Sequence, residues 1–197
     1  MEDISLHILD IAENSIDAGA RNVGIHITED LSRDLFRLEI TDDGKGLDPE
    51  TLKKVTDPFY TTRTTRKVGL GLALLEAAAK SANGHLDILS LPAAGTKVVA
   101  VFQLSHIDRK PLGEMAETLT TIISRRPDID VIYTHERNGR KFVFRTIDIR
   151  EQVGDMTINT VGTLNFVRKY VMQEENNLLD QRSRSNNGHA SSGCHSE

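Results

Sequence analysis

Four short segments in the first half of the chain contain residue types that could bind a nucleotide. In the first, the side-chain oxygen of Asn14 suits Mg²⁺, an ion that keeps several waters and bridges substrate phosphates. In the second, the carboxylate of Asp42 can accept a hydrogen bond from the exocyclic amine of adenine in a dry pocket. In the third, Gly69 and Gly71 open a predicted helix, whose first N–H groups and partial positive charge attract phosphate. The fourth is a glycine–threonine pair that ends at Thr96, where a strand is predicted to begin.

Each of these segments is weak evidence alone, and only their joint occurrence predicts a site. The sequence Asp-Asp-Gly-Lys-Gly at 42–46 is usually a turn after a strand, although Gly44 and Gly46 also let the backbone turn tightly beneath a flat base. Gly-Leu-Gly-Leu at 69–72 is a tight turn in most proteins, and a lone asparagine is most often a surface or capping residue. The order and spacing of all four segments together predict a nucleotide-binding site.

The elements that must position these segments are helices, indicated by apolar residues at helical spacing, and strands, indicated by alternating polarity. The apolar residues Ile4, Ile8 and Ile11 form a stripe at helical spacing that continues to Ser15, and this stripe predicts the first helix. Helices are expected at 3–18, 48–55 and 70–82. Strands are expected at 23–28, 35–41, 85–91 and 96–104, and a polar loop at 56–68. Strands joined by hairpins, with the helices grouped, predict an α+β fold of the two-layer sandwich type.

The four segments resemble the N, G1, G2 and G3 boxes of GHKL ATP-binding domains, which are shared by histidine kinases, type II topoisomerases and MutL mismatch-repair ATPases. The resemblance covers about residues 4–104. It implies the Bergerat fold, a mixed sheet with helices on one face, in which ATP lies between helices and a flexible lid. It also implies that Asn14 binds Mg²⁺ and that Asp42 contacts adenine. The other positions that it assigns to the nucleotide are Asp17, Ala18, Gly44, Gly46, Phe59, Arg63, Lys67, Gly69, Leu70, Gly71, Leu72 and Thr96.

The segments differ in the branch of the superfamily that they favour. Residues 13–20, Glu-Asn-Ser-Ile-Asp-Ala-Gly-Ala, closely resemble the N box of the MutL-type ATPases. Residues 57–63, Asp-Pro-Phe-Tyr-Thr-Thr-Arg, and the glycine box at 68–73 are similar to the F and G2 boxes of sensor histidine kinases. Because the lid and the second glycine box cover more sequence, the histidine-kinase branch is favoured.

Two departures from the family pattern bear on the reaction. A histidine kinase carries a phosphoacceptor histidine on a helical hairpin well before its N box, whereas only His7 precedes Asn14 here, and it is expected to be a helix-face residue. Members that hydrolyse ATP or phosphorylate serine have a glutamate where this chain has Asp10, which is expected to be the catalytic base. Asp10 is one methylene shorter, and a misplacement of about 1 Å can lower a rate ~100-fold. Glu13 is an alternative base, but it is expected to point elsewhere on the helix.

Three functions remain open at this point. The leading one is an ATP-binding kinase of the histidine kinase-like type that transfers the γ-phosphate to a partner protein. The alternatives are a slow ATPase that acts as a nucleotide switch of the MutL type, and a non-catalytic ATP sensor. In the lid, Arg63, Arg66 and Lys67 could contact the γ-phosphate, which fits the first two, or could form a solvated basic loop.

The bulk properties restrict the partners. A net charge of -5 leaves no basic excess for neutralising nucleic-acid phosphates, so no nucleic-acid partner is expected. A single cysteine, Cys194, permits no disulfide framework and fits a reducing compartment. The chain has no signal-peptide pattern and no apolar run near the ~20 residues that span a bilayer, so a cytoplasmic protein without a membrane partner is expected. A homodimer is left open.

The chain is expected to divide into three parts. Residues 1–105 form the ATP-binding domain, 112–179 form a small α+β unit without an assigned role, and 180–197 are a disordered polar tail. Within the second part, helices are expected at 114–125 and 160–179 and strands at 129–134 and 141–146.

Overall fold

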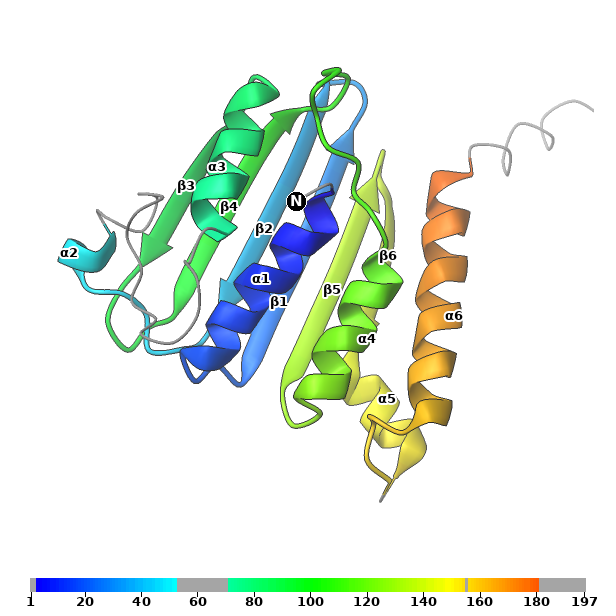
Figure 1. Ribbon diagram of the computed structural model, residues 1–197. Helices are drawn as coiled ribbons and strands as arrows, with labels where there is room; N and C mark the ends of the chain where they lie inside the picture. The colour runs from blue at the N-terminus through cyan, green and yellow to red at the C-terminus, as the bar shows by residue number, and fades with distance from the viewer. Residues whose placement is uncertain (1–2, 53–70, 155, 181–197) are drawn as a thin grey trace, which may run out of the picture.

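The computed structural model describes residues 3–52, 71–154 and 156–180, and within them six strands form a single sheet (Figure 1). The order of the strands is β3-β4-β2-β1-β5-β6, and only the β1–β5 pair is parallel. The strands are β1 (Asn22–Asp30), β2 (Leu35–Asp42), β3 (His85–Ser90), β4 (Thr96–Gln103), β5 (Asp130–Arg137) and β6 (Arg140–Arg145). The helices are α1 (Ile4–Asp17), α2 (Pro49–Leu52), α3 (Gly71–Ser81), α4 (Met115–Arg125), α5 (Thr146–Val153) and α6 (Val161–Leu179). The predicted α+β fold, with a mixed sheet and helices on one face, is confirmed.

The last two strands, β5 and β6, belong to the same sheet as β1 to β4. Val23 of β1 lies opposite Val131 of β5 in the parallel pair, and β6 pairs with β5 at the edge. Helix α4 lies beside α1 over the same face of the sheet (Figure 1). The described residues of 1–105 and of 112–179 therefore share one sheet and one hydrophobic core, and their behaviour as separate folding units stays a prediction.

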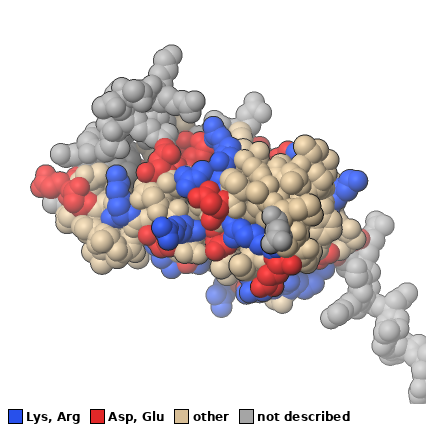
Figure 2. All heavy atoms as spheres, turned by 90° about the horizontal axis from the view of Figure 1, so that it is seen from below, with Lys and Arg blue, Asp and Glu red and all other residues tan. Residues whose placement is uncertain are grey.

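The surface carries charges of both signs. On the face shown in Figure 2, the Lys and Arg side chains of the described residues are interspersed with Asp and Glu, and no continuous basic area is visible among them. None of the helices in the described part of the chain has the length and apolar character needed to cross a membrane.

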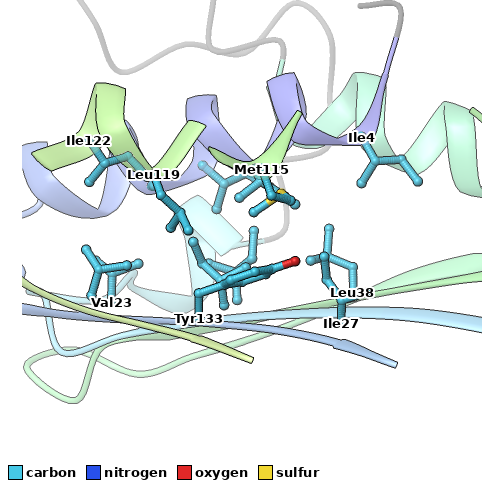
Figure 3. Close-up of a cluster of buried hydrophobic side chains, with 14 of the residues drawn as sticks. Ile4, Val23, Ile27, Leu38, Met115, Leu119, Ile122 and Tyr133 are labelled. Carbon is cyan, nitrogen blue, oxygen red and sulfur yellow. The ribbon is translucent and has the colours of Figure 1, made fainter. Parts of the chain in front are cut away.

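The core lies between the sheet and the helices because one face of each strand is apolar. In β1 and β2, Ile25 pairs with Ile40 and Ile27 with Leu38, and all four side chains are buried. Figure 3 shows the strand residues pointing toward the helix residues of this layer. The residues labelled there are Ile4, Val23, Ile27, Leu38, Met115, Leu119, Ile122 and Tyr133. The alternation of buried and exposed positions is what the period of a strand requires.

Helix α1 crosses the middle of the sheet and carries the first of the four segments at its C-terminal end. Its N-cap is Asp3, whose carboxylate accepts a hydrogen bond from the N–H of Leu6 at 3.1 Å. The helix ends before Gly19, which has a φ of +84° that favours glycine. Helix α1 buries Ile4 and Ile8 against the sheet, and it packs between α3 and α4.

Candidate functional site

Three of the four predicted segments meet at one end of the sheet. The N–H of Lys45, in the loop after β2, donates to the carbonyl of Ala18 at the end of α1 at 3.0 Å. The carbonyl of Lys45 accepts from the N–H of Ala93, in the turn between β3 and β4, at 2.8 Å. Asp42 lies opposite Thr96 in the β2–β4 pair. The loop is thus held between the helix and the hairpin, and it brings the candidate adenine residues together.

The carboxylate of Asp42 is fixed by two donors. The hydroxyl of Ser15 donates to Oδ2 at 2.7 Å, and the N–H of Gly44 donates to Oδ1 at 2.9 Å. Ser15 is buried, with 4% of its surface exposed. Ser15 was not predicted as a site residue, although a hydroxyl on the apolar stripe of a helix needs a polar partner and could have drawn attention to it. The two hydrogen bonds fix the orientation of the Asp42 carboxylate, which was predicted to contact adenine.

Glycines permit the close packing of this loop against the hairpin. Gly46 has a φ of +64°, and a Cβ added to it would lie 2.0 Å from the carbonyl oxygen of Leu91. Gly95 has a φ of +82°, and an added Cβ would lie 1.9 Å from the carbonyl oxygen of Asp42. Side chains at these two positions would force the loop and the turn apart, so the predicted requirement for glycine at 46 has a steric basis.

A second hydroxyl residue, Ser90 at the end of β3, ties the loop to Thr96. Its oxygen accepts from the N–H of Leu47 at 2.8 Å and lies 2.8 Å from the hydroxyl oxygen of Thr96. It also donates to the carbonyl of Gly95 at 3.0 Å. Ser90 lies outside the four predicted segments, and the sequence pattern indicated only that it is part of a strand.

The two neighbouring aspartates of the second segment have different surroundings. Asp43 accepts hydrogen bonds from the N–H of Asn22 at 2.8 Å, from its side-chain amide at 2.7 Å and from the N–H of Arg21 at 2.7 Å. These bonds from Asn22 and then Arg21 hold the pKa of the Asp43 carboxyl below its ordinary value. Asp43 therefore serves to anchor the loop to β1, whereas Asp42 points toward α1.

The phosphate side of the candidate site lies between α1 and the start of α3. The side-chain amide of Asn14 donates to Oδ2 of Asp10 at 3.3 Å, one helical turn away. A Cβ added to Gly71, the first residue of α3, would lie 1.8 Å from the same Oδ2 atom. The structure therefore brings Asp10, Asn14 and Gly71 together, and Leu72 beside them packs against the core. Asp17 and Ala18 lie at the end of α1, next to the loop that holds Asp42.

Glu13 points away from this group, as the sequence analysis expected. It forms an ion pair with Arg125 at the end of α4. Glu13 and Asn14 are neighbours in sequence, but one faces α4 and the other bonds to Asp10 on the α3 side. The alternative assignment of Glu13 as the catalytic base is therefore not favoured by its position.

His7 lies one turn before Asp10 and is buried, with 2% of its surface exposed. Burial is the largest influence on its imidazole and lowers its pKa, although the backbone of Gly71 and the charge of Asp10 act in the opposite direction. Among the described residues, its Nδ1 atom has no hydrogen-bond partner. A ring enclosed in this way is unsuited to accept a phosphoryl group, in agreement with the expected helix-face role.

Five of the predicted site residues, all in the lid or the second glycine box, lie outside the described residues: Phe59, Arg63, Lys67, Gly69 and Leu70. The tail at 181–197 also lies outside them.

The donor types at this site fit a nucleotide with Mg²⁺. Asp10 and Asn14 carry the oxygen donors that the ion prefers, and the approach of Gly71 to α1 leaves no room for a side chain between the start of α3 and Asp10. A mixed sheet with helices on one face and these groups at one end defines a nucleotide-binding module. The family model described as "Histidine kinase-, DNA gyrase B-, and HSP90-like ATPase" matches residues 2–106, and the chain belongs to this family.

The chain is similar over about 110 residues to sensor kinases. It is 32% identical to a "Putative sensor histidine kinase NtrY-like" of Rickettsia conorii over 110 residues, which are 56% of this chain and 18% of that protein. It is 36% identical to "Sensor protein kinase FleS" of Pseudomonas aeruginosa over 110 residues, 56% of this chain and 27% of that protein. The chain thus spans less than a third of the length of these relatives.

Among solved structures, the chain resembles the "Aquifex aeolicus MutL ATPase domain complexed with ADP" at 19% identity. That match has a TM-score of 0.45 and covers 78% of this chain and 68% of the other. The "N terminal domain of a DNA repair protein" matches at 19% identity with a TM-score of 0.49, over 73% of this chain and 52% of the other.

Proposed function

We propose that this protein binds ATP with Mg²⁺ and transfers the γ-phosphate to a partner protein, as a kinase of the histidine kinase-like type. The observation that carries the proposal is the meeting of Asp10, Asn14 and Gly71 at one end of the sheet, with Asp42 fixed in the adjoining loop. Membership of the ATPase family and the similarity to sensor kinases support it.

Each residue has a distinct role in this proposal. Asp42 accepts a hydrogen bond from the adenine amine, and Thr96 lies opposite it beneath the base. Asn14 would supply an oxygen to Mg²⁺, and the ion would neutralise part of the negative charge of the nucleotide. The N–H groups of the first turn of α3 meet the phosphates, and Asp10 accepts the proton of the attacking group on the partner. The remaining assignments at the nucleotide are Asp17, Ala18, Gly44, Gly46 and Leu72, together with Phe59, Arg63, Lys67, Gly69 and Leu70.

The proposed setting rests on the net charge of -5 and on the single cysteine of the chain, Cys194. We place the protein in the cytoplasm, with a phosphoacceptor or regulator protein as its partner, without nucleic acid or membrane as partners, and with homodimer formation left open. The interspersed charges on the face in Figure 2 are in line with a protein partner.

A slow ATPase that acts as a nucleotide switch is the second candidate. The ion pair between Glu13 and Arg125 favours it, since it joins the helix that holds Asn14 to α4 outside the family's matched region. In that case Asp10 would accept a proton from water, and the state of the nucleotide would reach the C-terminal part of the chain through α1.

Incubation with γ-labelled ATP and Mg²⁺, with and without candidate partner proteins, tests the proposal, and Asn14→Ala is the blank. We expect labelled partner that disappears in the blank, because the blank lacks the amide oxygen for the ion. Free phosphate that disappears in the blank, without labelled partner, would favour the ATPase switch. Binding of ATP without either product would favour a sensor, and absence of ATP binding by the native chain would refute the proposal.

Replacement of Ser15 tests the adenine side of the site. Ser15→Ala removes the donor to Oδ2 of Asp42, and we expect the affinity for ATP to fall about fivefold, the equivalent of one net hydrogen bond. Isothermal titration calorimetry measures this change. Ser81→Ala is the matched control, because Ser81 is exposed and its hydroxyl donates to the carbonyl of Ala78 within its own helix. Equal affinities of the two variants would contradict the assigned role of Ser15.

A further inference from the structure

Strand β6 forms one edge of the sheet. In the described part of the chain it pairs with β5 alone, and the order of the strands ends with it. The strand residues that were assigned to the nucleotide, Asp42 and Thr96, lie on β2 and β4, and β1 and β5 separate them from this edge. The edge is therefore a surface that the proposed binding of ATP does not use.

The register of β5 and β6 shows which backbone groups of the edge are open. Arg137 and Arg140 lie opposite each other across a two-residue turn at 138–139, in which both residues have a positive φ. Residues that flank such a turn direct their N–H and C=O groups at each other, and this direction alternates along each strand. The N–H and C=O groups of Lys141 and Val143 therefore point away from β5, toward the side on which an extended chain could pair with them.

Two aromatic side chains of α6 lie beside this edge. The rings of Phe166 and Tyr170 are stacked with their centroids 6.1 Å apart, and Tyr170 also packs edge-on against Phe142 of β6 at 5.7 Å. Arg168, which lies between them in sequence, forms an ion pair with Glu117 of α4. Because two residues correspond to about half a helical turn, both rings lie on the side of α6 away from α4. Figure 1 shows α6 as the outermost helix, next to β6.

This aromatic pair is only partly covered. Phe166 has 51% and Tyr170 has 38% of its surface exposed, although both rings contact the protein on one side. Partners that add a strand to a sheet edge gain affinity from backbone hydrogen bonds and specificity from their alternate side chains. The exposed faces of the two rings provide an apolar cover for those side chains of an added strand that point to the helix side.

The charges of β6 favour one class of partner. Three of its six residues, Arg140, Lys141 and Arg145, are cations, and none is acidic. Arg145 is paired with Asp148, whereas Lys141 has no ion pair among the described residues. Antiparallel pairing with a second copy around Val143 would place Lys141 opposite Arg145 of that copy, and like charges in this position are unfavourable. The edge therefore fits an acidic segment better than another copy of itself.

We propose that the β6 edge binds an extended, acidic segment of a partner protein, which adds to the sheet as a further strand. Its backbone pairs with the open groups of Lys141 and Val143, and its acidic side chains lie beside Lys141 on the face without helices. Its alternate, apolar side chains lie on the helix side, against Phe166 and Tyr170. The inference goes beyond the proposed function, because it requires neither ATP nor phosphate transfer.

A labelled short peptide of alternating glutamate and valine is the probe, and a peptide with lysine in place of each glutamate is its comparison. Fluorescence anisotropy with the full chain measures the binding of both. We expect the native chain to bind the glutamate peptide at least about fivefold more tightly than the lysine peptide, because only the glutamates carry the charge opposite to that of Lys141.

Val143→Pro tests the pairing of the backbone. Proline has no N–H to donate, but the N–H of residue 143 points away from β5, so the substitution leaves the β5–β6 pairing intact. We expect this variant to bind the glutamate peptide at least about tenfold more weakly, with thermal unfolding close to that of the native chain. If this variant does not fold, Lys141→Glu takes its place and should reverse the preference between the two peptides.

Phe166→Ala tests the aromatic cover, and we expect about fivefold weaker binding of the glutamate peptide. Met172→Ala is the matched control. Met172 is a large apolar residue of the same helix with 44% of its surface exposed, but it follows Arg168 by one turn and so lies toward α4. It should leave the affinity unchanged, and equal losses in the two variants would contradict the role of the aromatic pair.

The remaining outcomes decide between occupants. The inference is overturned if the native chain does not bind the glutamate peptide, binds both peptides equally, or if Val143→Pro binds as the native chain does. Sedimentation equilibrium tests for a second copy: a native dimer that Val143→Pro dissociates would assign the edge to self-association instead. Titration with ATP is a separate measurement, so a chain that binds the peptide but not ATP would retain this inference and lose the proposed function.

Discussion

Gly71→Ala is expected to abolish ATP-dependent phosphate release or transfer. The added Cβ would lie 1.8 Å from Oδ2 and 2.8 Å from Cγ of Asp10, distances at which atoms cannot coexist. Either Asp10 rotates away and loses its hydrogen bond with Asn14, or the start of α3 moves off α1. Both responses displace the proposed base from the phosphate site, and a displacement of about 1 Å is enough to lower a rate ~100-fold. Turnover with γ-labelled ATP measures the effect.

Gly162→Ala is the matched control for this substitution. Gly162 is also a glycine near the start of a helix, but an added Cβ would meet no atom within 4 Å. We expect unchanged turnover and a gain in stability of up to about 1 kcal/mol, since alanine favours the helix over glycine. A Gly71→Ala variant with native turnover would show that the contact between Asp10 and α3 is not needed, and the assignment of Asp10 as the base would then be withdrawn.

Glu175→Gln is expected to destabilise the protein by about 3 kcal/mol, because it breaks a buried ionic network. The carboxylate of Glu175 on α6 accepts from the hydroxyl of Tyr133 at 2.7 Å and lies 2.8 Å from Nδ1 of His135. On its other side, the His135 ring lies 3.5 Å from Glu29, and Arg137 donates to Glu29. The two carboxylates, Glu175 and Glu29, balance the positive charges of His135 and Arg137. The loss of the Glu175 carboxylate leaves the charge of His135 only partly compensated.

The same network makes stability depend on pH. Burial lowers the pKa of His135, but the hydrogen bond with Glu175 and the nearby charges of Glu175 and Glu29 outweigh it and raise this pKa from 6.5 to about 9. A raised pKa in the folded state contributes stability that is complete below pH 6.5 and is lost as the pH rises through about 9. We expect this loss to amount to roughly 3 kcal/mol in the native chain. It should be much smaller in Glu175→Gln, and denaturant unfolding at a series of pH values measures it.

Glu174→Gln controls for the loss of a charge on α6. Glu174 is the neighbouring residue, and its carboxylate accepts only from the side chain of Asn177 on the same helix among the bonds seen in the described residues. Its free energy of unfolding and its pH dependence should follow those of the native chain. If both glutamate variants unfold alike, the network around His135 does not hold α6 to the sheet.

The local pattern of the sequence predicted most of the elements around the site. The alternation that predicted a strand at 35–41 corresponds to β2, and the helical stripe at 3–18 corresponds to α1 with Asp3 as its N-cap. The antiparallel pairing of β2 with β4 places Asp42 opposite Thr96, and both residues were predicted to lie at the nucleotide. The periodicity of side chains is a local property, so it can be read from one stretch of sequence.

What the sequence did not predict depends on contacts between distant segments. The parallel pairing of β1 with β5 joins residues on the two sides of the expected boundary, and nothing in the pattern of either strand indicates it. The bond of Ser15 with Asp42 and the bonds of Ser90 with the loop likewise connect different elements. The strand expected at 141–146 ends one residue early, because Thr146 begins α5, a helix that the sequence analysis missed and whose residues lack a clear apolar stripe.

The pairing of β1 with β5 also has a consequence for how the chain is synthesised. β1 lies inside the sheet, but its partner on one side emerges from the ribosome only after the whole family-matched region has been made. Until then the backbone groups of β1 that face β5 form an open edge, of the kind that recruits other strands and promotes aggregation. The nascent chain thus depends on the later synthesis of β5 to cover this edge of β1, and a translational pause before Asp130 would prolong the exposed state.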